Sequence, residues 1–377
     1  MKKAILNVLQ FLLFLGIGAG ILFLVFKHQN QAYNDDCCIK SIPEWNTIQS
    51  EEQKQALLEQ CRQKSLAETG CLPLTDKLIA DFKSTNFAWI ALVLLAFVIS
   101  NINRTYKWKM LLQPMGYRPR FINGFLSILV GYFANLGLPR MGEVVRAGLL
   151  SRYEHIPVEK VMGTIVVDRV VDVLCLGGAF LLALVFESEK IWNYIVASKG
   201  AGQGGNAGGI WLLLLLAGAV FAGLLFVFRN QILKNRIVQK VIQMIKGFWE
   251  GIQTVRRLEK PGLFVFHSVS IWVLFFLMTW LGFQSFQPTA HLGFGAALTV
   301  FVFGTLGFVI PSPGGMGTFH ALVIASLTTF YAIKGDDAFA IANIIFFSVS
   351  IGFNVLLGLI SLIVLPLINK NYQPGVE

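Results

Sequence analysis

Six stretches of this chain are apolar for long enough to cross a lipid bilayer, and this constrains the fold more than any other feature. About 18–20 apolar residues span the hydrocarbon layer. The runs are 4–26, 86–102, 161–186, 209–228, 263–283 and 338–367. Hydrophobic residues make up 55% of the chain and charged residues only 14%, against about 25% charged in soluble domains. The sequence therefore predicts an all-α polytopic membrane protein.

The first run resembles a secretory signal peptide, because lysines at positions 2 and 3 precede it. The length of this run and the lack of a small-x-small cleavage site favour a retained anchor. We expect four parts: the membrane anchor 1–26, an exported loop or cap 27–84, a transmembrane domain 85–367 and a tail 368–377.

The placement of the basic residues predicts the orientation of the chain. The formal net charge is +10, but the lysines and arginines gather in short linkers beside apolar runs, as the positive-inside rule expects. This pattern favours a membrane over nucleic acid as the partner. Linkers 103–120 and 229–260 should be cytoplasmic, like both chain ends, in a bacterial inner membrane. The loop 27–84 has mixed charges and should be exported.

Cysteine usage agrees with that orientation. Cys37, Cys38, Cys61 and Cys71 lie in the exported loop, where disulfides persist. Four cysteines allow three pairings, and we discount the strained adjacent pair Cys37–Cys38. Unpaired thiols or a metal site are the alternatives to disulfides. The sequence Ser50-Glu51-Glu52-Gln53 is a capping box that predicts a helix through Cys61.

The two basic linkers also limit the number of crossings. If both are cytoplasmic, the chain between them crosses an even number of times, and the runs 161–186 and 209–228 already make two. The segment 121–157 should therefore enter the membrane and return, and by the same count so should 293–333 from the outer side. Non-helical backbone at that depth is tolerated where it is buried in protein or lines a wet cavity.

The turns of these two segments resemble each other. NLGLPRMGEVVRAGLL at 135–150 and TLGFVIPSPGGMGTFHALVI at 305–324 share LG, a proline, Met-Gly and a new apolar run. Such a pair indicates an inverted repeat whose broken helices meet near the midplane, where transporters bind substrates. We expect about six full crossings plus two re-entrant hairpins in inverted orientation. The alternative is eight simple crossings with Gly/Pro kinks.

The third apolar run contains three charges, Asp168, Arg169 and Asp172. Each charge at the centre of a membrane helix costs about 2.5–3.5 kcal/mol, so these residues should be paired, hydrated or turned towards protein. The two aspartates are four residues apart and share a helix face, and Arg169 can reach Asp172. The two aspartates and Arg169 together leave one negative charge, which requires a further cation. That cation would be Arg140, Arg146 or another buried group.

A second charged turn follows the first break, where Glu143 and Arg146 are three residues apart. We expect it to face the turn that holds Asp168, Arg169 and Asp172. The two arginines would hold a phosphate bidentately, and the carboxylates would neutralise them between cycles or meet a headgroup amine. The alternative is a fixed salt-bridge network that locks the broken helices together.

The second break should complete this site. Its small residues would let backbone N–H groups approach an anion closely, and they are Pro313, Gly314, Gly315 and Gly317. Helix N-termini after both breaks would add partial positive charge. His320 could have a functional role, as a member of the site or as a proton carrier. The alternative is that it is a hydrogen-bonded packing residue.

Three motifs carry a family resemblance: N-x-x-x-P-x-x-G-E-x-x-R at 135–146, V-x-G-T-I-V-V-D-R-V-V-D at 161–172 and P-S-P-G-G-M-G-T-F at 311–319. They resemble the lysylphosphatidylglycerol synthase transmembrane-region family, the flippase-like membrane part of the multiple peptide resistance factor. The resemblance spans roughly 85–367. The characteristic positions are Pro139, Gly142, Glu143, Arg146, Asp168, Arg169, Asp172, Pro313, Gly314, Gly315 and Gly317.

The resemblance implies that the chain moves a lipid across the bilayer. In full-length relatives a cytoplasmic domain aminoacylates phosphatidylglycerol, and we expect this chain not to synthesise lipid because it has no such domain. Relatives often have an acid where His320 stands, so a cationic headgroup partner is not expected at that position. The loop 27–84 is expected to be an insertion.

We expect a phospholipid translocator and no enzyme, cofactor or metal. The chain has no G-x-x-x-x-G-K-[ST] motif, so ATP would have to come from a partner. The alternatives are a carrier or membrane partner in polyprenyl-phosphate glycolipid handling, and a non-transporting assembly factor. Expected partners are a phospholipid or lipid-linked phosphate and a separate lipid-modifying enzyme, and an oligomer is compatible with the sequence.

Overall fold

The computed structural model describes residues 2–42, 45, 48, 50–62, 71–137, 141–188, 255, 258–310 and 312–373. The elements in these ranges are all helices, with no strand among them, so the predicted all-α class is confirmed for the described part. The predicted crossing 209–228 and most of the linker 229–260 lie outside the described residues.

Four helical stretches are long and apolar enough to cross a membrane: Phe87–Met115, Val158–Phe186, Pro261–Gln284 and Gly335–Ile368. The first contains α4 (Phe87–Leu112), the second is α7 and the third is α12. The last joins α15 (Gly335–Ile345), a π-helical segment η6 (Phe346–Phe353) and α16 (Asn354–Ile368). They agree with four of the predicted runs, although α4 extends well beyond the expected end at residue 102.

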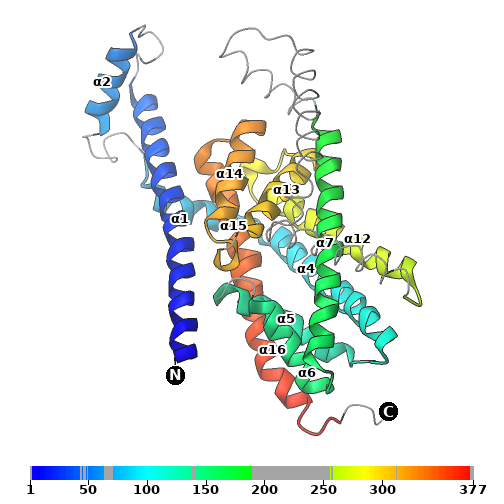
Figure 1. Ribbon diagram of the computed structural model, residues 1–377. Helices are drawn as coiled ribbons and strands as arrows, with labels where there is room; N and C mark the ends of the chain where they lie inside the picture. Colours follow the sequence, from blue (N-terminus) through cyan, green and yellow to red (C-terminus); the bar gives the residue numbers. More distant parts are fainter. Residues whose placement is uncertain are drawn as a thin grey trace, which may run out of the picture.

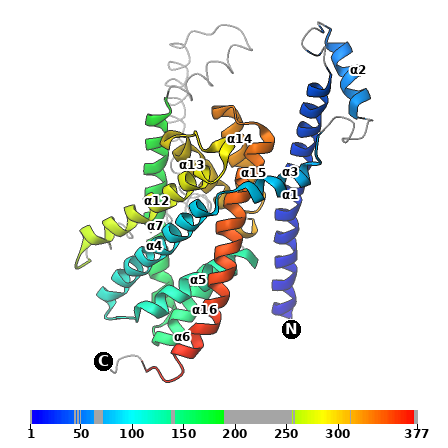
Figure 2. The ribbon, with the colours of Figure 1, turned by 180° about the vertical axis from the view of Figure 1, so that it is seen from behind.

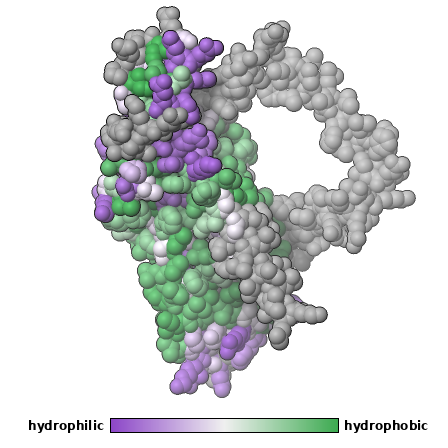
Figure 3. All heavy atoms as spheres, turned by 90° about the vertical axis from the view of Figure 1, so that its left-hand side faces the viewer, coloured by the Kyte–Doolittle hydropathy of each residue, from purple (hydrophilic) through white to green (hydrophobic). Residues whose placement is uncertain are grey.

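The outer surface has the polarity of a membrane protein. Figure 3 shows a broad apolar band with hydrophilic residues at both ends of the molecule. Large apolar side chains are exposed on α7 and α16, among them Val185 at 70% and Leu367 at 68%. Apolar patches of this extent mark contact with another apolar phase, here the lipid. The chain is therefore a multi-pass membrane protein.

The first helix, α1 (Lys2–Ser41), continues well past the predicted anchor 1–26. The helix therefore continues without a break from the predicted anchor into the cap, and the anchor's end at residue 26 stays a prediction. The cap adds α2 (Glu51–Arg62), which begins directly after Ser50 as the capping box predicts, and α3 (Leu74–Ser84). Figure 1 shows α2 at the end of the molecule opposite the N-terminus.

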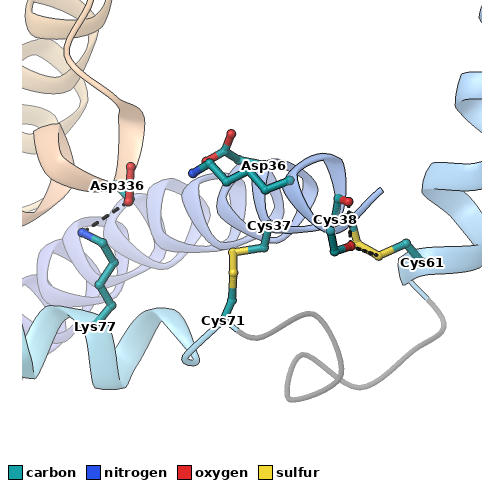
Figure 4. Close-up of a disulfide and its surroundings, with 9 residues drawn as sticks. Asp36, Cys37, Cys38, Cys61, Cys71, Lys77 and Asp336 are labelled. Atoms are coloured by element: carbon teal, nitrogen blue, oxygen red, sulfur yellow. Dashed lines mark hydrogen bonds and ion pairs between the residues drawn. A yellow bond between two sulfur atoms is a disulfide. The ribbon is translucent and has the colours of Figure 1, made fainter. Parts of the chain in front are cut away.

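Two disulfides hold the cap to the end of α1. The structure pairs Cys37 with Cys71 and Cys38 with Cys61, and Figure 4 shows both beside α1. Lys77 of α3 then ties the cap to α15. The cap is therefore fixed covalently to α1 and by ion pairs to the membrane part.

Two helical hairpins form where the sequence predicts breaks. The first pairs α5 (Phe121–Gly137) with α6 (Met141–Glu154). The second pairs α13 (Phe294–Val309) with α14 (Thr318–Tyr331) through the short turn η5 (Pro313–Gly315). The longest of these helices has 17 residues and spans about 26 Å, less than the roughly 30 Å of a bilayer core.

The hairpins occupy opposite halves of the molecule. In Figures 1 and 2, α5 and α6 lie near the ends of α1 and α16 that carry the chain termini, whereas α13 and α14 lie near the other end. Their tips meet, because a Cβ added to Gly314 would lie 2.9 Å from Cδ2 of Leu136. The two hairpins therefore meet tip to tip, and their re-entrant, inverted insertion into the membrane stays a prediction.

Candidate functional site

A cluster of buried charges joins α4, α6 and α7. Asp168 of α7 is only 1% exposed, and its carboxylate pairs with Lys107 at 2.6 Å, Arg104 at 3.3 Å and Arg146 at 3.4 Å. Asp172 lies one turn further along α7 and pairs with Arg104 and Lys107 at 3.3 Å. The cluster therefore satisfies the buried carboxylates that the apolar run would otherwise not tolerate.

Helical spacing positions these side chains. Asp168 and Asp172 are one turn apart on α7, and Arg104 and Lys107 are one turn apart on α4, so each pair faces its partner. Next to them, Trp108 Nε1 donates a hydrogen bond of 2.9 Å to Thr164 Oγ1. That bond fixes the register of α4 against α7 at the level of the charges.

The outer part of the cluster is accessible. Arg169 Nε lies 2.5 Å from Glu143 Oε1, and Arg169 Nη1 lies 3.3 Å from Asp172 Oδ2. The side chain of Arg169 is 44% exposed and that of Glu143 is 28% exposed. The two charged turns therefore face each other as expected, with an arginine available to a ligand.

The cluster has an excess of positive charge. It contains four cations and three carboxylates, and every carboxylate contacts at least one cation. The buried Nε atoms of Arg104 and Arg146 have no hydrogen-bond partner. The cluster can therefore accept one more negative charge without leaving an acid unpaired.

A cavity of about 660 Å³ opens beside the cluster. Its charged wall consists of Arg104, Glu143, Arg169 and Asp172. Other parts of the lining come from the second break and from the π-helical segment, and most of the remaining lining is apolar. The volume lies in the range of small-ligand pockets, about 300–1,000 Å³.

The cavity reaches the outer surface between apolar side chains. Val173, Phe308, Val309 and Ile310 line it and are also 45–60% exposed on the surface of the protein. They belong to α7 and to the end of α13, within the apolar part of the molecule. The opening is therefore suited to a molecule that is polar at one end and apolar at the other.

The residues predicted from sequence divide into three groups. Glu143, Arg169, Asp172, Gly314 and Gly315 line the cavity. Arg146 and Asp168 lie behind the wall, in contact with each other at 3.4 Å. Pro313 and Gly317 shape the second break but are not on the wall, and Arg140 lies outside the described residues.

The glycines of the second break are required by its backbone. Gly314, Gly315 and Gly317 have φ of 57°, 80° and 81°, a region in which only glycine is unstrained. A side chain at Gly315 would also collide with Phe308. The sequence SPGGMG at 312–317 is therefore explained by a turn that brings backbone to the cavity wall.

His320 lies away from the cavity. Its ring is fully buried and packs 4.6 Å from the ring of Phe346 and 6.4 Å from that of Phe339, between ring centroids. Among the described residues neither nitrogen of the ring has a hydrogen-bond partner, so the hydrogen bond expected of a packing residue is not seen, and the role of His320 stays a prediction.

Sequence reasoning missed two members of the cluster. It assigned Arg104 and Lys107 to a cytoplasmic linker 103–120, which is wrong: both are in α4 and are 4% and 0% exposed. Their burial leaves 113–120 as the linker, with Arg118 and Arg120 as its basic residues. A helical stripe from Phe97 through Arg104 to Trp108 was the signal that could have placed them.

Among the described residues, no group of three or more His, Cys, Asp or Glu side chains is arranged to hold a metal ion. The fold and the site define a multi-pass helical membrane protein with a charged cavity between two broken hairpins. The chain belongs to the family described as the lysylphosphatidylglycerol synthase TM region, whose model matches residues 71–358. The resemblance read from the motifs is confirmed.

A curated relative agrees with this assignment. The UPF0104 membrane protein MJ1595 of Methanocaldococcus jannaschii is 26% identical over 280 residues, which cover 68% of this chain and 79% of the relative. No solved structure matches the chain. The family match begins at Cys71, so α1 and α2 lie outside it.

Proposed function

We propose that this protein moves a phospholipid headgroup across the bacterial cytoplasmic membrane, and that the polar part of the lipid passes through the charged cavity. The observation that carries the proposal is one cavity that combines an apolar opening with a charged wall belonging to a cluster with one excess positive charge. The family match supports a lipid-related function in a membrane.

Arg169 is the proposed phosphate ligand. Its side chain is 44% exposed and lines the cavity, and guanidinium matches phosphate oxygens bidentately. A phosphodiester carries one negative charge, which balances the single excess positive charge of the cluster. Glu143 would hold Arg169 in place when no lipid is bound.

The acyl tails would remain in the bilayer. Val173, Phe308 and Val309 at the opening are apolar and exposed, so tails can stay in hydrocarbon while the headgroup enters. This route avoids exposing the charged headgroup to hydrocarbon, where an unpaired charge costs several kcal/mol.

The two hairpins are the proposed moving parts. They lie in opposite halves of the molecule and meet beside the cavity, as in transporters that expose one site alternately to each side. With no nucleotide-binding motif in the sequence, the motion would be downhill or coupled to an ion. The protein would act as a translocator and not as an enzyme.

The orientation belongs to the same proposal. The N-terminal end of α1 and the C-terminal end of α16 lie at one end of the molecule (Figure 1), and we place that end in the cytoplasm. The cap then lies outside the cell, where its disulfides would persist.

The test is lipid movement in liposomes. Purified protein is reconstituted with phospholipids that carry a fluorophore on an acyl chain, and the fraction bleached by an impermeant reductant measures the rate of translocation. We expect Arg169→Ala to reduce the rate at least tenfold, because it removes the exposed phosphate ligand. Arg118→Ala, which removes an exposed arginine in the linker, should leave it unchanged.

Two results would overturn the proposal. A folded Arg169→Ala protein with the wild-type rate would refute the phosphate site. A wild-type protein that moves no lipid, whether a phospholipid or a polyprenyl phosphate, would favour a non-transporting assembly factor.

A further inference from the structure

The long helix Gly335–Ile368 widens into a π-helix beside the cavity. The π-helical turns cover Phe346–Phe353, and Val349, Ser350 and Asn354 of this region line the cavity. Such bulges are rare in helices and occur mostly at functional sites. They also turn side chains to directions that a regular helix does not offer.

Two polar side chains of this region, Ser350 and Asn354, therefore line the same cavity as the charges. The side-chain nitrogen of Asn354 donates a hydrogen bond of 3.2 Å to the carbonyl oxygen of Ser350. The side-chain oxygen of Asn354 is buried and has no hydrogen-bond partner. An unpaired buried acceptor is unfavourable, and rotation of the amide towards the cavity that Asn354 lines would let a hydroxyl group of a ligand satisfy it.

The charges of the cavity limit what else the ligand can carry. Glu143 and Asp172 are the acids that line the cavity, and both are already paired with Arg169. An ammonium group would have to displace that arginine to find a carboxylate. A neutral hydroxylated group needs no counter-charge and can use the amide and hydroxyl of the π-helical wall.

We propose that Ser350 and Asn354 form the second half of the headgroup site, and that the substrate is a lipid phosphate whose remaining headgroup is neutral and hydroxylated, such as glycerol or a sugar. This inference rests on the proposed function, in that it takes the same cavity as the lipid site. The phosphate is held at Arg169, and the hydroxyl groups donate to Asn354 in the same cavity of about 660 Å³.

The experiment measures lipid binding in detergent, apart from transport, by native mass spectrometry with competing lipids. The lipids share acyl chains and differ in headgroup: phosphatidylglycerol, phosphatidylethanol with the same charge and no hydroxyl, and phosphatidylethanolamine. A polyprenyl phosphate linked to a hexose forms the fourth arm. We expect phosphatidylglycerol or the hexose lipid to bind about fivefold more tightly than phosphatidylethanol, the value of one hydrogen bond.

The variants separate the two halves of the site. Asn354→Leu should abolish the preference over phosphatidylethanol, and Ser350→Ala should reduce it if Asn354→Leu fails to fold. Asn343→Leu is the matched control. Like Asn354, Asn343 donates a side-chain hydrogen bond to the carbonyl oxygen of the residue four positions before it, here Phe339, but it does not line the cavity. Arg169→Ala should weaken binding of both anionic lipids equally.

The outcomes distinguish this inference from the proposed function. Equal binding of phosphatidylglycerol and phosphatidylethanol, or tighter binding of phosphatidylethanolamine, would overturn the hydroxyl site even if liposomes show translocation. A hydroxyl preference that disappears in Asn354→Leu would support the site even if translocation is absent. Whether phosphatidylglycerol or the hexose lipid binds more tightly assigns the source of the headgroup.

Discussion

Asp168 is the residue on which the buried charge cluster depends. It contacts three cations from two helices, α4 and α6, and it is fully enclosed by protein. Removal of one partner from a buried ion pair costs about 3–5 kcal/mol, because the other charge is left uncompensated. The position is therefore structural as well as part of the proposed site, which distinguishes it from the exposed Arg169.

We predict that Asp168→Asn lowers the free energy of unfolding by about 3–5 kcal/mol, because Lys107, Arg104 and Arg146 lose their shared carboxylate. Thermal unfolding in detergent measures the change. The double variant Lys107→Met/Asp168→Asn should recover part of the loss, since it removes one cation together with the acid. A double variant as unstable as the sum of the single variants would contradict this coupling.

The sequence revealed Asp168 and Arg146 more readily than their partners for a physical reason. Asp168 interrupts an apolar run, and a charge inside such a run requires a partner. Arg104 and Lys107 follow an apolar run, where basic residues also mark a cytoplasmic linker. Whether these basic residues are buried partners of Asp168 or part of a cytoplasmic linker depends on the packing of α4 against α7. That packing cannot be predicted from a single sequence.

At the scale of elements, the two helices of the first hairpin approach each other closely at Gly142 of α6. Its N–H donates a hydrogen bond of 2.8 Å to Asn135 Oδ1 of α5, and an added Cβ would collide with the carbonyl oxygen of Gly131. The two helices can approach this closely because Gly142 has no side chain, and the side-chain amide of Asn135 holds them together.

We predict that Gly142→Ala forces α5 and α6 apart and lowers both stability and lipid translocation. The matched control is Gly148→Ala in the same helix, where an added Cβ meets nothing within 4 Å. That control should be neutral or stabilising by up to about 1 kcal/mol, because alanine favours helices over glycine. Thermal unfolding and the liposome assay test the pair, and equal behaviour of the two variants would contradict the close-approach argument.

The breaks were predictable at this scale, whereas the π-helix was not. Pro313 and the glycines after it cannot continue a helix, so the second break is evident from the chain. The segment Phe346–Phe353 contains no comparable signal, and the sequence indicated one plain crossing over 338–367. A π-helix results from side-chain packing around the cavity, which local sequence does not encode.

At the scale of the whole molecule, the cap is joined to the membrane part through Lys77. Its ammonium contacts Asp81 of the same helix at 2.8 Å and reaches Asp336 and Asp337 at the start of α15 at 3.2 and 3.0 Å. Figure 4 shows Lys77 and Asp336 facing each other near the Cys37–Cys71 disulfide. Because α15 continues through the π-helix to α16, this contact connects the cap to the helix that lines the cavity.

Lys77 should contribute to stability over the whole neutral range of pH. Burial by itself lowers the pKa of Lys77, but hydrogen bonds to Asp81 and Asp337 and the charge of Asp336 outweigh it and raise the pKa above that of an ordinary lysine. A raised pKa gives stability that is fully present below the unfolded value of about 10.4. That stability is lost only as pH rises through the higher folded pKa.

We predict that Lys77→Met lowers the free energy of unfolding by about 1–2 kcal/mol at pH 7, a value reduced for partial exposure to solvent. The difference from wild type should be constant between pH 7 and pH 9 and should shrink only above about pH 10.4. Lys83→Met is the control, because Lys83 lies on the same helix α3 and is exposed. Thermal unfolding across pH measures both variants, and a difference that already shrinks between pH 7 and pH 9 would show that the ammonium of Lys77 does not hold the cap to α15.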